Sequence, residues 1–113
     1  MHELSLCGAI ADVASRRAGD RHVSAVHVRI GQLRQVVPDT LAFCWDLVVE
    51  GSGLAGAALE IERVPALLRC RSCAGEFRPE PHSGLACTAC GGLDCEVLTG
   101  EELDVTALDL VAG

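Results

Sequence analysis

Two CxxC motifs constrain this chain more than any other feature of its sequence. They are Cys70-Arg71-Ser72-Cys73 and Cys87-Thr88-Ala89-Cys90, with thirteen residues between them. Two such turns can place four thiolates around one ion, which is the closed tetrahedral arrangement of structural zinc. Glycines that follow the motifs, Gly75 after the first and Gly91 and Gly92 after the second, allow the backbone to turn tightly. We therefore expect a zinc site made of Cys70, Cys73, Cys87 and Cys90.

The same motifs also occur in rubredoxin-like iron sites and in redox dithiols. The two pairs are arranged symmetrically, so the sequence does not single out one cysteine as a candidate for a lowered pKa. This symmetry disfavours a redox function. Four protein thiolates leave no open position for water, which disfavours catalytic zinc. We expect the metal to stabilise the fold of the region around the cysteines. We also predict that the protein is not an enzyme, because no Ser/His/Asp set, phosphate-binding glycine loop or pair of catalytic carboxylates stands out.

Three cysteines and one histidine lie near these patterns without belonging to the quartet. Cys7 and Cys44 fall within helical apolar patterns, which predicts small buried side chains. Cys95 follows the second motif closely and is an alternative ligand. His82 is either an auxiliary ligand or a surface residue of the loop.

Composition narrows the classes of partner and compartment. The 113-residue chain carries sixteen acids against nine basic residues, a formal charge of −7, which disfavours nucleic-acid binding. The main exception to this acidic character is a group of three arginines around the first motif, which could form a nucleic-acid surface: Arg69, Arg71 and Arg78. No secretory signal or apolar stretch of bilayer length is visible, so we expect no membrane partner. The odd number of cysteines, seven, favours metal binding in a reducing cytoplasm.

The hydrophobic pattern predicts an α+β fold. We expect two helices packed on a small mixed three-stranded sheet, with an inserted CxxC/CxxC zinc-ribbon-like domain. In the first helix Leu6, Ile10, Val13 and Arg17 share a face. In the second, Leu41, Trp45 and Val48 do so, flanked by Cys44 and Leu47. The expected elements are a helix to about residue 18, a strand over 22–30, a helix over 38–50, and strands over 58–64 and 102–110.

The N-terminus offers a second set of metal ligands. The amine of Met1, the backbone nitrogen of His2 and its imidazole Nδ1 close a five-membered and a six-membered chelate ring around one ion. Planar nitrogen coordination suits Ni(II) or Cu(II) and fits zinc badly. We expect Met1 to be retained, because His2 is bulky. On spacing alone, a solvated His2 without a metal remains the alternative.

These features together resemble the HypA/HybF family of nickel metallochaperones for hydrogenase maturation. The resemblance joins Met1-His2-Glu3-Leu4-Ser5 to the two CxxC motifs. It continues through the segments Val28-Arg29-Ile30-Gly31-Gln32-Leu33, Val37-Pro38-Asp39, Gly56-Ala57-Ala58-Leu59-Glu60-Ile61, Arg69-Cys70 and Gly100-Glu101-Glu102-Leu103.

The resemblance implies a carrier that delivers Ni(II) to the large subunit of NiFe-hydrogenase together with the GTPase HypB. It makes His2 the principal nickel ligand, with backbone nitrogens of Met1, His2 and Glu3 as further candidates, and makes zinc the ion of the cysteine quartet. Two departures from the family stand out. Thr88 replaces a frequent proline, and the histidine nearest the second motif is His82, with none beyond Cys90.

From this we expect a discontinuous nickel-binding α/β domain, residues 1–64 plus 97–113, and a zinc-binding domain, residues 65–96. We expect a monomer or weak homodimer, and the sequence leaves hydrogenase and urease open as clients. The alternative is a zinc-ribbon module for protein or nucleic-acid interaction, with no role in nickel handling.

Overall fold

The computed structural model describes residues 2–80, 82 and 84–112. Its contacts divide the chain into two compact units. The helical unit comprises residues 1–29, 36–62 and 103–113, and the cysteine unit comprises residues 30–35 and 63–102. The expected nickel and zinc domains were defined by their metals and remain a prediction. No helix in the described part of the chain has the length and apolar character needed to cross a membrane.

The first helix, α1 (His2–Ala18), ends at the residue predicted from the sequence. Its buried side chains are Leu6, Cys7, Ile10, Ala14 and Ala18. Arg17 lies beside this stripe, and its guanidinium donates a hydrogen bond to the carbonyl oxygen of Val105 at 2.7 Å. Gly19, at φ +64°, ends the helix with its N–H bonded to the Ser15 carbonyl. This is the left-handed glycine C-cap typical of helix ends.

Strand β1 (Val23–Gly31) and a short 3-10 helix, η1 (Gln32–Arg34), lead to helix α2 (Pro38–Val49). Pro38 occupies the first turn of α2, as predicted. The buried face of α2 consists of Leu41, Cys44, Trp45 and Val49. The indole N–H of Trp45 donates to the Ala57 carbonyl at 2.9 Å. Leu47 was expected beside this face, but it is 54% exposed.

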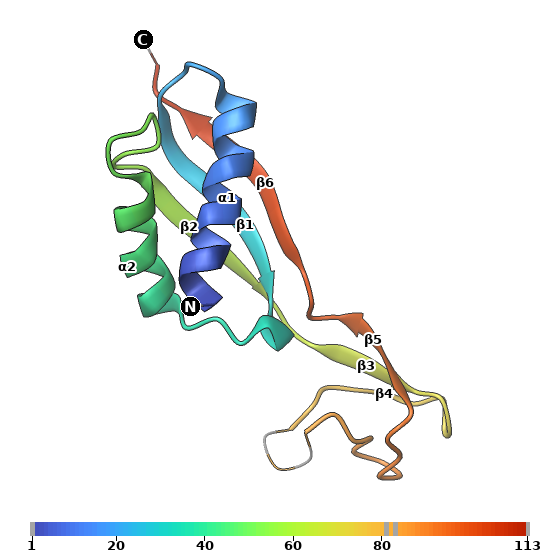
Figure 1. The fold of residues 1–113 in the computed structure, drawn as a ribbon. Helices are drawn as coiled ribbons and strands as arrows, with labels where there is room; N and C mark the ends of the chain where they lie inside the picture. Colours follow the sequence, from blue (N-terminus) through green and yellow to red (C-terminus); the bar gives the residue numbers. More distant parts are fainter. Residues whose placement is uncertain (1, 81, 83, 113) are drawn as a thin grey trace. The chain divides into compact units, whose positions relative to one another are not determined.

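The sheet of the helical unit has the strand order β2-β1-β6, with β2 (Ala58–Val64) and β6 (Leu103–Leu110) as its edges. Figure 1 shows β1 and β2 running in the same direction and β6 running opposite to them. The sheet is therefore mixed. The parallel pair follows from the crossover through α2, because parallel neighbours cannot be joined by a tight turn. Val26, Val28 and Ile30 of β1 are buried.

The cysteine unit has its own antiparallel sheet, which was not predicted from the sequence. Its order is β4-β3-β5, with Leu68 of β3 opposite Phe77 of β4 and Val97 of β5. The strands are β3 (Leu67–Cys70), β4 (Glu76–Phe77) and β5 (Cys95–Thr99). A small core of Ala66, Leu68, Cys70, Phe77 and Cys87 packs with the half-buried Leu33, Cys95 and Val97.

Two segments that carried the family resemblance meet within the cysteine unit. The N–H of Gly31 donates to the Glu102 carbonyl, and the N–H of Leu33 donates to the Gly100 carbonyl, both at 2.8 Å. A Cβ atom on Gly31 would lie 2.0 Å from the Gly100 oxygen, and Gly100 itself has φ +121°. Both glycines are therefore required for this close backbone approach.

The predicted fold class is confirmed: two helices pack on a mixed three-stranded sheet, and the chain between β2 and β6 carries the cysteine motifs. The second sheet, made of three short strands, is the main addition to that prediction.

Candidate metal centre

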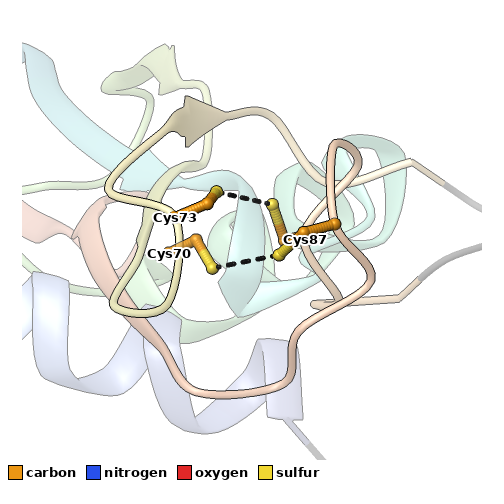
Figure 2. A group of neighbouring side chains, drawn as sticks. Cys70, Cys73 and Cys87 are labelled. Atoms are coloured by element: carbon orange, nitrogen blue, oxygen red, sulfur yellow. Dashed lines mark hydrogen bonds between the residues drawn. The ribbon is translucent and has the colours of Figure 1, made fainter.

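The cysteine unit brings the four predicted sulfur ligands together. Cys70 is the last residue of β3, and Cys73 lies in the turn that follows it. Cys87 and Cys90 lie between β4 and β5. Figure 2 shows the side chains of Cys70, Cys73 and Cys87 directed toward a common centre. All four Sγ atoms lie within 4.8 Å of one another, and they form the one group of this kind among the described residues.

The sulfur–sulfur distances match the size of a zinc–thiolate tetrahedron. The Sγ atoms of Cys70 and Cys90 are 3.6 Å apart, and those of Cys73 and Cys87 are 3.7 Å apart. With Zn–S bonds of about 2.3 Å, the edge of a regular tetrahedron is about 3.8 Å. A disulfide requires about 2.05 Å, so these are free thiols. The residues therefore fit a four-coordinate zinc ion.

The backbone forms the same turn at both motifs. At the first, Cys70 N–H donates to the Gly75 carbonyl and Ala74 N–H donates to the Cys70 carbonyl. At the second, the corresponding bonds join Cys87 to Gly92 and Gly91 to Cys87. The residue after each motif is left-handed, with φ +64° at Ala74 and +74° at Gly91.

The glycine prediction thus holds for Gly91, whereas in the first turn the left-handed residue is Ala74 and not Gly75. Gly75 and Gly92 are instead close to the sulfurs. A Cβ on Gly92 would lie 3.3 Å from the Cys90 sulfur and 3.4 Å from the Cys70 sulfur, and one on Gly75 would lie 3.5 Å from the Cys73 sulfur. Glycine is therefore favoured at positions 75 and 92, because a larger side chain would crowd the cysteine sulfurs.

Hydrogen bonds from these turns favour thiolates at the first cysteine of each motif. The pKa of Cys70 is lowered to about 6, chiefly by the backbone N–H of Cys73, with help from Ser72. The pKa of Cys87 is lowered in the same way by the backbone of Cys90 and Ala89.

At Cys90, by contrast, the hydrogen bonds favour the protonated thiol. The Gly92 backbone lowers the pKa of Cys90, but hydrogen bonds with the sulfurs of Cys70 and Cys87 outweigh this effect and raise that pKa to about 12. A dication at the centre would favour the thiolate form at all four positions.

Ion pairs hold the strands on either side of the turns. The guanidinium of Arg71 contacts the Asp94 carboxylate at 2.9 Å. Arg69 contacts Glu76 at 2.9 Å and Glu96 at 3.5 Å. Two of the three arginines that could have formed a nucleic-acid surface are therefore engaged by carboxylates of the same unit. The sequence did not reveal these pairs, because their members come together only when β3, β4 and β5 align.

The remaining three cysteines lie outside the quartet. Cys95 lies opposite Cys70 in the sheet, and its thiol contacts the Gly92 carbonyl, but it is not a member of the quartet. Cys7 and Cys44 are buried, as predicted. Burial, followed by the neighbouring Cys44 and Glu3, raises the pKa of Cys7 to about 11, and its thiol donates to the Leu41 carbonyl. His82 is exposed.

The predicted nickel ligands lie at the edge of the described chain. Met1 and the side chain of His2 are outside the described residues. The backbone of His2 begins α1, and Glu3 follows in its first turn. One carboxylate oxygen of Glu3 accepts a hydrogen bond of 3.4 Å from the N–H of Val37, just before α2. The assignment of His2, Met1 and Glu3 as nickel ligands remains a prediction.

Comparison with known proteins gives a consistent result along the chain. The family model HypA, described as a hydrogenase/urease nickel incorporation metallochaperone, matches residues 1–110. The hydrogenase maturation factor HypA of Geotalea uraniireducens is 44% identical over 110 residues, covering 97% of this chain and 99% of the relative. That of Streptomyces avermitilis is 39% identical over 112 residues, covering 96% of this chain and 86% of the relative.

A solved structure supports the fold. The solution structure of the nickel metallochaperone HypA from Helicobacter pylori superposes with a TM-score of 0.67 at 20% identity, covering all of both chains. The family model and the curated relatives confirm the resemblance proposed from the sequence motifs. This chain belongs to the HypA family of nickel-incorporation metallochaperones for hydrogenase maturation.

Proposed function

We propose that this chain carries Ni(II) at its N-terminus and delivers it during NiFe-hydrogenase maturation, with a structural zinc ion in the cysteine unit. The family match over residues 1–110 carries the proposal, since it includes both the N-terminal motif and the quartet. The protein acts as a carrier and not as a catalyst.

Cys70, Cys73, Cys87 and Cys90 hold the zinc ion in this proposal. The 3.6 and 3.7 Å sulfur–sulfur distances support it, as do the backbone hydrogen bonds of the two turns. Zinc supplies folding free energy here, because the small core of the unit holds few side chains. A closed set of thiolates leaves the ion no position for a substrate.

His2 is the principal nickel ligand in this proposal, with backbone nitrogens of Met1, His2 and Glu3 as candidates. Because α1 starts at His2, the N–H groups of its first turn have no partner within the helix. Binding nickel through these nitrogens therefore breaks no helical hydrogen bond. We expect an incomplete, exposed ligand set to bind nickel with micromolar affinity, about −8 kcal/mol, so that the ion can be released.

The proposed partners are a HypB-type GTPase and the hydrogenase large subunit, in the cytoplasm, where thiols stay reduced. The negative charge of −7 and the paired Arg69 and Arg71 argue against a nucleic-acid partner. A membrane partner is not proposed, and the chain acts as a monomer or weak homodimer. Urease as a second client rests on the family description alone.

Metal analysis combined with nickel titration tests the proposal. The purified protein is expected to contain one zinc ion per chain and to bind one Ni(II). The change His2→Ala should weaken nickel binding at least about tenfold, while zinc content stays the same. His82→Ala is the matched control, because this exposed histidine lies in the cysteine unit and should leave nickel binding unchanged.

Equal nickel affinity in wild type and His2→Ala would refute the nickel site. One zinc ion without any nickel binding would instead favour the zinc-ribbon interaction module. Red protein as purified would indicate iron in the quartet. Nickel binding should also weaken as the pH falls, because protons compete for the imidazole, the amine and the amide nitrogens.

A further inference from the structure

Helix α2 presents two large apolar side chains to solvent. Phe43 is 66% exposed and Leu47 is 54% exposed, although both belong to a helix whose other side is buried. They are four residues apart and therefore neighbours on one face. Asp39, Asp46 and Glu50 are exposed at spacings of three and four residues from them. We call these five residues the α2 face.

The charge of this part of the chain has one sign. From Gln35 to Glu62 the sequence contains no Arg, Lys or His, and its acids are Asp39, Asp46, Glu50, Glu60 and Glu62. Ion pairs in the described part of the chain engage Glu62, through Arg29, but none of the three acids of the α2 face. Among the residues that the structure describes, this exposed apolar pair is thus framed by carboxylates that form no ion pair.

We propose that the α2 face docks a basic amphipathic helix of a partner protein. Phe43 and Leu47 can pack against the apolar stripe of such a helix, and its Lys and Arg side chains can meet Asp39, Asp46 and Glu50. The same carboxylates repel nucleic acid and anionic lipid. A two-fold contact between copies of this chain would place acids against acids, so a second copy is disfavoured as well.

A partner bound at the α2 face would be close to the start of α1, where nickel is proposed to bind. This link to nickel delivery rests on the proposed function. The hydrogen bond from Val37 N–H to the Glu3 carboxylate brings the first turn of α1 next to the start of α2. Figure 1 shows both helices starting at the same end of the unit. A partner helix that covers the start of the α2 face would therefore lie near Glu3, one of the residues proposed to hold nickel.

The test uses full-length, zinc-loaded protein and a fluorescein-labelled helical peptide of about 18 residues, built from Leu and Lys at amphipathic spacing. Fluorescence anisotropy should show saturable binding that weakens as the salt concentration rises from about 0.05 M to about 0.5 M. A peptide with Glu in place of every Lys should bind at least about tenfold more weakly.

Variants locate the binding on the protein. Phe43→Ser with Leu47→Ser should weaken binding at least about tenfold, and Asp46→Asn with Glu50→Gln should reduce both affinity and salt dependence. Both pairs are exposed, so circular dichroism and the melting temperature should match wild type. Leu93→Ser is the control: this leucine is 84% exposed but belongs to the cysteine unit, and its loss should change nothing.

Three results would overturn the proposal. The first is no binding of the Leu/Lys peptide, and the second is equal binding of both peptides. The third is a dimer by analytical ultracentrifugation that Phe43→Ser with Leu47→Ser converts to a monomer, because the occupant would then be a second copy. All of these readouts need no nickel, so a failure of the nickel assignment would leave this test unaffected.

Discussion

The two CxxC turns differ in the residue at their left-handed position, and this difference predicts opposite effects of two substitutions. Ala74 and Gly91 hold equivalent left-handed positions, with φ +64° and +74°. A left-handed residue other than glycine costs about 1–2 kcal/mol. The first turn therefore carries a cost that the second avoids, and Ala74→Gly should relieve it, whereas Gly91→Ala should introduce it.

The net change in the free energy of unfolding depends on the effect of each substitution on both the folded and the unfolded state. A Cβ on Gly91 would meet nothing within 4 Å, so the cost of Gly91→Ala comes from the backbone alone. Against this cost, alanine restricts the unfolded chain and recovers about 0.4–1 kcal/mol. We expect a net loss of about 0.5–1 kcal/mol for Gly91→Ala and a gain of similar size for Ala74→Gly.

Competition with a chromophoric chelator measures the effect, because zinc binding and folding of the cysteine unit are coupled. Zinc affinity should rise about 2–5-fold in Ala74→Gly and fall about 2–5-fold in Gly91→Ala. The double variant should return close to wild type and serves as the control. Changes of the same direction in both single variants, or weaker zinc binding by Ala74→Gly, would refute the reasoning.

Three further predictions concern the same unit. Gly31→Ala should destabilise the protein by about 3 kcal/mol or more in thermal melts, because its Cβ would lie 2.0 Å from the Gly100 oxygen; Gly8→Ala, where a Cβ meets nothing within 4 Å, is the control and should not destabilise. The pKa of the Cys70 thiol is lowered from its ordinary value of 9.0 to about 6, so the stabilisation from its thiolate is present above pH 9 and is lost as the pH falls toward 6. Chelator competition between pH 8 and pH 5 should therefore show zinc affinity falling throughout this range and more steeply below pH 6. Cys95→Ser should keep one zinc ion by metal analysis, since Cys95 is not a member of the quartet, and a chain that lost its zinc would contradict this.

The sequence was most informative where chemistry depends on local spacing. The CxxC motifs predicted the quartet, because two cysteines three residues apart in a tight turn are brought together by that turn alone. The pattern of apolar side chains predicted α1, including its end at Ala18, and the start of α2 at Pro38. The N-terminal ligand set was also visible in the sequence, and it remains a prediction.

Tertiary structure decided the features that depend on residues far apart in the chain. The short strands β3, β4 and β5 have too few residues for a clear alternating pattern, and they become a sheet only through their pairing. The close approach of Gly31 to Gly100, separated by most of the chain, could not be read from either segment alone.

The exposed positions of Phe43 and Leu47 were likewise beyond the sequence. Helical spacing places apolar side chains on faces, but it does not say how wide a stripe the sheet and α1 will cover. The buried face of α2 is Leu41, Cys44, Trp45 and Val49, which leaves Phe43 and Leu47 in solvent. The local sequence thus predicted the candidate metal ligands, and packing determined which apolar side chains of α2 remain exposed.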